Sequence, residues 1–166
     1  MHDCTFESER QIVTTFEEVR DGVVEIARRA KRSITILTPD LEPGVYDTEE
    51  FLDAVKQLVL AKRIARMRVL ISEPGRTVRN GNRLIALGRR LNTNIDFRNL
   101  HEDYRSTLRG AFIIADDQAV LYRTDSRGYD GIMGSFEPSN AKRHLDAFEQ
   151  PWAASVYRYD TPLERI

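Results

Sequence analysis

The sequence contains few of the residues that most often mark chemistry or processing. Its 166 residues include one cysteine, three histidines and one tryptophan. A lone cysteine, Cys4, cannot form an internal disulfide, so the chain does not require an oxidising compartment. The N-terminus has no basic and apolar signal region, and no apolar run approaches the ~20 residues of a membrane helix. We therefore expect a cytoplasmic protein with no membrane partner.

Familiar ligand motifs are missing as well. No group of histidine, cysteine and carboxylate residues has the spacing of a metal site. No G-x-G-x-x-G follows the first apolar strand-like run, and no G-x-x-x-x-G-K-[ST] occurs, so neither phosphate-cradling loop is present. We expect no cofactor and no metal.

Arginine is the charged residue with an uneven distribution. The net charge is −1, yet residues 76–127 hold ten arginines, no lysine and six acids. Arginine binds phosphate and carboxylate bidentately, whereas lysine acts as a point charge. This tract is either an anion-binding surface or a set of solvated helix faces. Tyrosines 104, 122 and 129 interleave with arginines, which keeps weak nucleic-acid binding open despite a pI of about 6.3.

Apolar periodicity predicts alternating helices and strands in the first hundred residues. A capping box at Thr15 begins a helix, Thr48 begins a second, and a third runs from about residue 81 to 91. Strands are expected at 33–38, 67–71 and 94–97. Residues 111–115 and 119–123 then form a hairpin across a three-residue turn. Ser139 is expected to cap a last helix that Pro151 kinks or shortens.

This element order predicts the fold class. We expect a single α/β domain over residues 1–166, with a mixed, mostly parallel sheet, a terminal antiparallel hairpin and helices on both faces.

The order resembles one repeat of the phospholipase D superfamily. Residues 109–116 (RGAFIIAD) lie where that superfamily carries H-x-K-x4-D. The aspartate is kept as Asp116, but Arg109 replaces the histidine and Ala111 the lysine. The resemblance implies a histidine nucleophile and a phosphate-binding lysine in active members. Because this chain lacks both, we expect it not to be an enzyme.

A second resemblance is to a bacterial family of phospholipase D-like domains of unknown function, sometimes fused to GNAT-type acetyltransferases. The matching segments are residues 36–41, 46–47, 68–71, 81–84, 87–91, 95–98 and 148–155. That family implies the fold and no established activity.

The predicted binding site lies where strands end and loops begin. It is expected to comprise Tyr46, Glu73, Arg98, Arg109 and Arg123, with Asp116 nearby. Arg109 in the vacated histidine position suits a phosphate or carboxylate that is held but not cleaved. In the competing interpretation, Arg98, Arg123 and Asp116 form structural ion pairs.

The sequence therefore predicts a non-catalytic module that binds an anionic ligand or a protein partner. The alternatives are a cryptic phosphodiesterase or phosphotransferase using other residues, and a weak nucleic-acid binder. Because active phospholipase D enzymes use two repeats, we also expect a homodimer that brings Arg109 of both chains toward a shared groove. A monomer with a polar mouth is the competing outcome.

Overall fold

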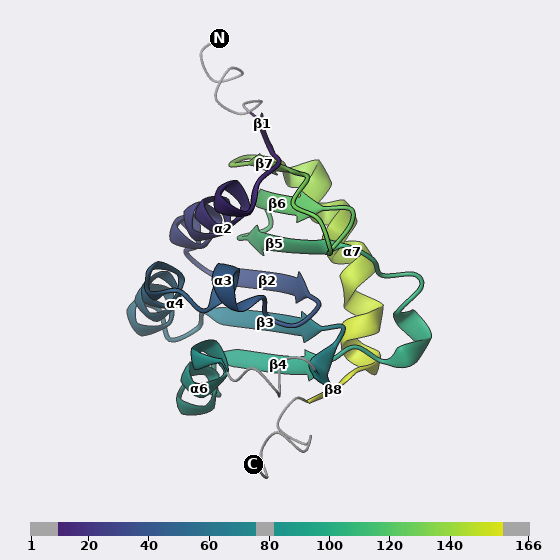
Figure 1. The fold of residues 1–166 in the computed structure, drawn as a ribbon. Helices are drawn as coiled ribbons and strands as arrows, with labels where there is room; N and C mark the ends of the chain where they lie inside the picture. The colour runs from purple at the N-terminus through teal and green to yellow at the C-terminus, as the bar shows by residue number, and fades with distance from the viewer. Residues whose placement is uncertain (1–9, 76–81, 158–166) are drawn as a thin grey trace.

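The chain folds around one eight-stranded sheet, shown in Figure 1. A computed structural model describes residues 10–75 and 82–157. The strand order is β1-β7-β6-β5-β2-β3-β4-β8. The strands are β1 (Arg10–Val13), β2 (Ser33–Thr38), β3 (Arg66–Ile71), β4 (Ile95–Asn99), β5 (Ala111–Ala115), β6 (Ala119–Arg123), β7 (Gly131–Gly134) and β8 (Val156–Tyr157).

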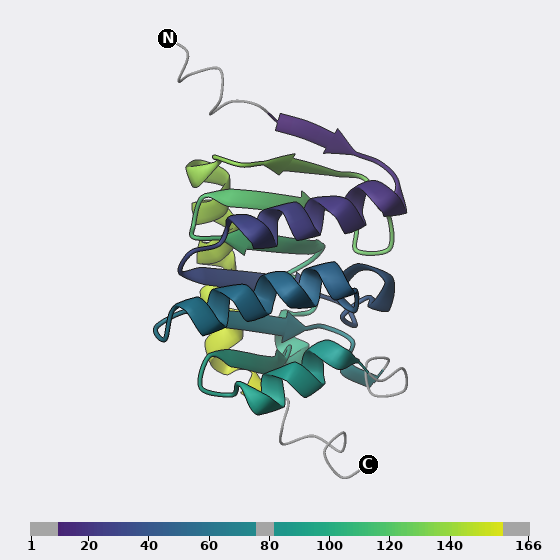
Figure 2. The ribbon, with the colours of Figure 1, turned by 90° about the vertical axis from the view of Figure 1, so that its left-hand side faces the viewer.

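Helices cover both faces of the sheet, as the sequence predicts. Helices α2 (Phe16–Arg29), α4 (Glu49–Ala61) and α6 (Arg83–Arg90) lie on one face, and α7 (Pro138–Ala154) crosses the other (Figures 1 and 2). A one-turn helix, α3 (Pro43–Tyr46), follows β2, and a 3₁₀ turn, η1 (Glu102–Tyr104), follows β4. The α/β fold class is confirmed.

Side-chain caps fix where three helices begin. The Thr15 side chain accepts a hydrogen bond from the Glu18 backbone N–H, and the Glu18 carboxylate accepts one from the Thr15 backbone N–H. These two bonds complete the predicted capping box. The Thr48 hydroxyl accepts from the backbone of Phe51 at the start of α4. Asn82 caps α6 in the same way.

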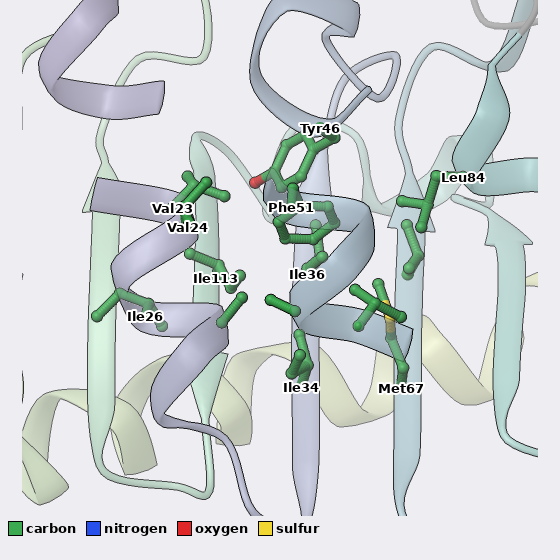
Figure 3. Close-up of a cluster of buried hydrophobic side chains, with 14 of the residues drawn as sticks. Val23, Val24, Ile26, Ile34, Ile36, Tyr46, Phe51, Met67, Leu84 and Ile113 are labelled. Atoms are coloured by element: carbon green, nitrogen blue, oxygen red, sulfur yellow. The ribbon is translucent and has the colours of Figure 1, made fainter. Parts of the chain in front are cut away.

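Two apolar cores lie on opposite sides of the sheet. Successive strand residues point to opposite faces, so Ile34 and Ile36 of β2 pack beneath α2 and α4 with Phe51 (Figure 3). Leu37 points the other way and joins the cluster that contains Phe148 of α7. The larger core therefore holds the three helices on one face, and the smaller one holds α7.

The predicted hairpin is confirmed, but its place in the sheet differs from the prediction. Phe112 pairs with Tyr122, and Ile114 with Val120. However, β5 also pairs antiparallel with β2, and β7 and β1 extend the sheet beyond β6. The sheet thus has two parallel and five antiparallel pairs, so "mostly parallel" was wrong and the hairpin is internal.

Details of the termini of the elements also differ. The last helix begins at Pro138 after Glu137, so Ser139 is not its cap. Proline suits the first helical position because its missing N–H would be unpaired there. Pro151 does not shorten the helix, which continues to Ala154. Part of the predicted third helix, Gly81, lies outside the described residues.

Candidate functional site

A hollow of about 760 Å³ lies beyond the C-terminal ends of the parallel strands. Its lining comes from residues 72–75 after β3, residues 105, 108–110 before β5, and residues 124–127 after β6. A smaller hollow of about 350 Å³ adjoins it and shares Glu73, Ser126 and Arg127. Three loops that are distant in sequence thus meet at the edge of the sheet where the site was predicted.

Arginine supplies most of the charge around this hollow. Arg105, Arg109 and Arg127 line it and are exposed, and the described acids in the lining are Glu73 and Asp125. The Nε–H group of Arg109 donates to the carbonyl of Ser106 at 3.1 Å. Within residues 10–75 and 82–157, nothing accepts a hydrogen bond from its Nη groups, so these donors remain available to an anion.

The backbone beside Arg109 is fixed by a glycine. Gly110 has a φ of +83°, a conformation that side chains disfavour. A Cβ atom there would also lie 2.3 Å from the carbonyl oxygen of Arg123. Glycine therefore lets the start of β5 approach the end of β6 and places Arg109 at the edge of the hollow.

Arg123 lies beneath the hollow and is structural. It is 3% exposed. Its guanidinium donates to the Glu42 carboxylate and, at 2.8 Å, to the carbonyl of Gly128. Arg123 therefore joins the loop after β6 to the loop after β2. The expectation of a structural ion pair is met by Glu42, which the sequence did not identify.

Tyr46 is placed near this pair but cannot reach the hollow. It is 1% exposed and packs edge-to-face on Phe51, with ring centroids 5.2 Å apart. Burial raises the pKa of the Tyr46 phenol, and the nearby Glu42 carboxylate raises it further. Tyr46 is thus a core residue under the site.

Asp116 lies at the other end of β5 and is wrongly placed by the prediction. The strand between Arg109 and Asp116 separates the two residues by about 20 Å. The Asp116 carboxylate accepts backbone N–H bonds from Lys31, Arg32 and Ser33, at 2.7–3.0 Å. It ties the β5–β6 turn to the start of β2. Asp116 is therefore a structural carboxylate.

Arg98 was also expected in the site, but its side chain lies on the α7 face. Its Nη1 group donates to the Trp152 carbonyl at 2.7 Å, and its guanidinium carbon is 4.2 Å from the centroid of the Trp152 ring. This cation–π contact joins β4 to the end of α7. Of the six predicted residues, the structure brings Glu73 and Arg109 together in the hollow, over buried Arg123 and Tyr46.

The sequence prediction did not select Arg105 and Arg127 as site residues. Both belong to the arginine-rich tract, which was the available signal. Their loops were not placed together, because the turn of η1 and the segment after β6 meet only in the folded chain. His101 is exposed and caps η1, accepting a backbone N–H bond from Asp103.

In the part of the chain that the structure covers, no cluster of three histidine, cysteine or carboxylate residues could hold a metal ion. None of the helices in that part has the length and apolar character needed to cross a bilayer.

Several solved structures share this fold. Nuc from Salmonella typhimurium, a phospholipase D family member, has a TM-score of 0.60 and 18% identity over 90% of this chain and 98% of Nuc. TrmBL2, an archaeal chromatin protein, has a TM-score of 0.66 and 12% identity over 92% of this chain and 55% of its own. Phosphatidylserine synthase from Haemophilus influenzae Rd KW20 scores 0.55 at 11% identity over 89% of this chain and 38% of its own.

At these identities the likeness shows the fold alone, and that fold is the phospholipase D fold. The chain spans about half of TrmBL2 and less of the synthase. A search of curated proteins gives no match. The predicted association with acetyltransferase domains stays a prediction. Residues 15–161 match the profile of a family described as a domain of unknown function, DUF7931, and the chain belongs to that family.

Proposed function

We propose that this chain is a non-catalytic phospholipase D-like module that binds a phosphate-bearing ligand in the hollow around Arg109. The observation that carries the proposal is the convergence of three exposed arginines on one hollow at the ends of the strands. Guanidinium groups bind phosphate oxygens through two parallel N–H bonds. Three of them on separate loops can hold one phosphate group from several sides.

The chemistry of the lining favours holding over cleaving. Arg109 stands where the superfamily carries its histidine nucleophile, and arginine stays protonated and cannot attack phosphorus. The described lining residues include no histidine, cysteine or lysine. Its hydroxyl groups, on Ser72, Thr124 and Ser126, are weak nucleophiles unless a base activates them. A bound phosphodiester would therefore remain intact.

Nucleic acid is a second source of the same phosphate chemistry. TrmBL2, which shares the fold, is reported with a mode of DNA binding. Bases bind single-strand sites by stacking on aromatic rings. Tyr129, at 39% exposure, lines the adjoining hollow. One exposed ring supports a short phosphate-bearing ligand better than a long strand.

Self-association belongs to the same proposal. The predicted homodimer follows from the two repeats of active phospholipase D enzymes, because a single repeat would leave the apolar face between them open. Among the residues that the structure describes, Tyr129 is the large apolar side chain exposed there. A polar mouth favours a monomer when no ligand is bound. Two arginine clusters repel each other, so a dimer that brings them together would form only with a bound anion between them.

Calorimetric titration tests the proposed function. We expect pyrophosphate or a mononucleotide to bind, and Arg109→Ala to weaken binding about tenfold or more. Arg143→Ala is a matched control, because Arg143 is also exposed and its Nη2 group donates to the Asn140 side chain at 3.1 Å, away from the hollow. A single-stranded oligonucleotide that binds far more tightly than a mononucleotide would replace the small ligand with nucleic acid.

A turnover assay completes the test. The protein should not hydrolyse an aryl phosphodiester, phosphatidylcholine or single-stranded DNA. Sustained turnover that Arg109→Ala or Glu73→Gln abolishes would contradict the non-catalytic assignment. Absence of binding to every phosphate compound would contradict the ligand class.

A further inference from the structure

The edge of the sheet opposite the hollow carries a different kind of surface. Here helices α2, α4 and α6 end and strands β2, β3 and β4 begin, as Figure 2 shows. Hydrogen bonds join the successive connections: the Arg66 backbone N–H donates to the Arg32 carbonyl, and the Asn94 side chain donates to the Arg63 carbonyl. We call residues 28–33, 60–66, 89–94 and 116–118 the basic edge.

Positive charge is concentrated on the basic edge. It contains nine cations and two aspartates, a net +7, so the rest of the chain carries −8. All nine cations are exposed, and they are Arg28, Arg29, Lys31, Arg32, Lys62, Arg63, Arg66, Arg89 and Arg90. One of the aspartates, Asp116, is buried and bound to backbone N–H groups. Within the described ranges, Arg29 forms an ion pair, with Glu25, and the other eight form none.

Helix stability explains only part of this charge. Cations in the last turn of a helix interact well with its C-terminal carbonyl groups. That accounts for Arg28 and Arg29 in α2, and for the arginine pair that ends α6. Lys31, Arg32 and Arg63 follow the helices, where this benefit has faded. Their exposure and lack of ion pairs point to an external anionic partner.

Two large apolar side chains project from the centre of the basic edge. Leu60 in the last turn of α4 is 74% exposed, and Ile64 in the following turn is 73% exposed. Lys62 and Arg63 lie between them in sequence. Single exposed apolar residues are ordinary, but two at the end of one helix, with cations between them, form a surface that is both apolar and basic. In Figure 2 this α4–β3 connection projects at the edge of the molecule.

We propose that the basic edge docks on an anionic lipid bilayer, with Leu60 and Ile64 entering the interface and the surrounding cations contacting headgroups. Anionic leaflets attract basic clusters, and short apolar side chains bury at the boundary between headgroups and acyl chains. Nucleic acid would use the cations but would gain little from aliphatic side chains, because bases stack on aromatic rings. Peripheral docking needs no spanning helix.

The orientation follows from the fold. The basic edge lies at the N-terminal ends of β2 and β3, and the hollow lies beyond their C-terminal ends. A chain docked through the basic edge would therefore hold the Arg109 hollow away from the bilayer, open to the aqueous phase. This docking does not depend on the proposed ligand, so either proposal can fail alone.

Vesicle co-sedimentation tests the docking with the full chain. We expect binding to vesicles of phosphatidylcholine with about one-third phosphatidylserine, weak or no binding to phosphatidylcholine alone, and weaker binding as salt rises. The double variant Leu60→Ser/Ile64→Ser should bind about tenfold less tightly or worse. Ile12→Ser is the matched control, because Ile12 is 76% exposed on the distant strand β1.

Fluorescence gives a positive readout that does not depend on loss of binding. In the Leu60→Trp variant, the fluorescence emission of the introduced tryptophan should shift to shorter wavelength when the anionic vesicles are added. In the Ile12→Trp variant, the emission should not shift. Equal binding to neutral vesicles, or an unchanged double variant, would overturn the proposal. So would an oligonucleotide that displaces the vesicles and binds the double variant normally, or a dimer that the double variant abolishes without any vesicle binding.

Discussion

Arg109 and Arg123 lie at the same end of the β5–β6 hairpin, yet the fold uses them in opposite ways. Arg123 is 3% exposed and bonds to Glu42 and Gly128. Arg109 is exposed, gives one N–H to a backbone carbonyl and lines the hollow. A buried arginine with fixed partners holds loops together, whereas an exposed one beside a hollow can meet a ligand.

Asp116 at the far end of the hairpin extends this comparison. It is 9% exposed and accepts three backbone N–H bonds, so it resembles Arg123 rather than Arg109. In the phospholipase D-like segment of residues 109–116, the retained residue is thus the structural one. Of the two positions that differ from the superfamily motif, Arg109 lines the hollow and Ala111 is buried in β5.

Removal of Arg123 should have the largest effect on stability. Arg123→Ala removes the buried guanidinium that bonds to Glu42 and to the Gly128 carbonyl, and breaking a buried pair from one side costs about 3 kcal/mol or more. We expect the free energy of unfolding, measured in urea, to fall by that amount. Adding Glu42→Gln should recover part of the loss. If Arg123→Ala unfolds like the parent protein, the buried pair does not hold the loops.

Asp116→Ala should be slightly milder. It leaves the N–H groups of residues 31–33 without their carboxylate partner, which costs about 2–3 kcal/mol. Asp116→Asn should lose less, because asparagine also tolerates the positive φ of 55° found there. Urea unfolding measures both variants, and ligand binding by the folded fraction should be unchanged. A variant of normal stability that fails to bind would place Asp116 in the site.

His144 on α7 makes stability depend on pH. Burial against Tyr122 and Phe112 lowers the pKa of His144, and Arg143 lowers it further. The unfolded chain then binds a proton more readily than the folded one, so stability falls as pH decreases below about 6.5. In His144→Gln, this fall should be smaller. Urea unfolding between about pH 7 and 5 measures the difference, and parallel curves would exclude His144 as the cause.

The smallest effect on stability is expected for Arg109→Ala. An exposed residue without a buried partner changes the free energy of unfolding by less than about 0.5 kcal/mol. The difference in unfolding free energy between Arg109→Ala and Arg123→Ala is therefore the sharpest test of the comparison between the exposed and the buried arginine. A large loss of stability in Arg109→Ala would show that Arg109 is a structural residue as well.

The sequence predicted the elements whose signals are local. Capping residues and apolar periodicity identified α2, α4 and the paired strands β5 and β6. The sequence does not predict strand β7, because its four residues include two glycines and its extended shape comes from pairing with β6 and β1. The position of β5 beside β2 is equally non-local, so the sheet was expected to be more parallel than it is.

The same distinction explains the site. The end of a strand can be predicted, which placed Glu73 and Arg109 correctly at the edge of the sheet. Arg98 follows Phe97, which packs in the core beneath the three helices, so strand alternation directs Arg98 to the opposite face. The strand pattern does not show that Trp152 of α7 covers that face and binds Arg98 there. Arg105 and Arg127 lie on loops that come together only in the folded chain, and no local sequence pattern predicts that contact.

The central claim is that the exposed arginines of the hollow, and not the buried ones, bind a phosphate-bearing ligand. Nuclear magnetic resonance of the arginine Nε–Hε groups during a pyrophosphate titration tests this most directly. We predict saturable shifts for Arg105, Arg109 and Arg127, and unchanged signals for buried Arg123 and for Arg98 and Arg143, which do not line the hollow. Shifts confined to Arg98 or to the arginines of the basic edge, or no saturable shift at all, would contradict the account.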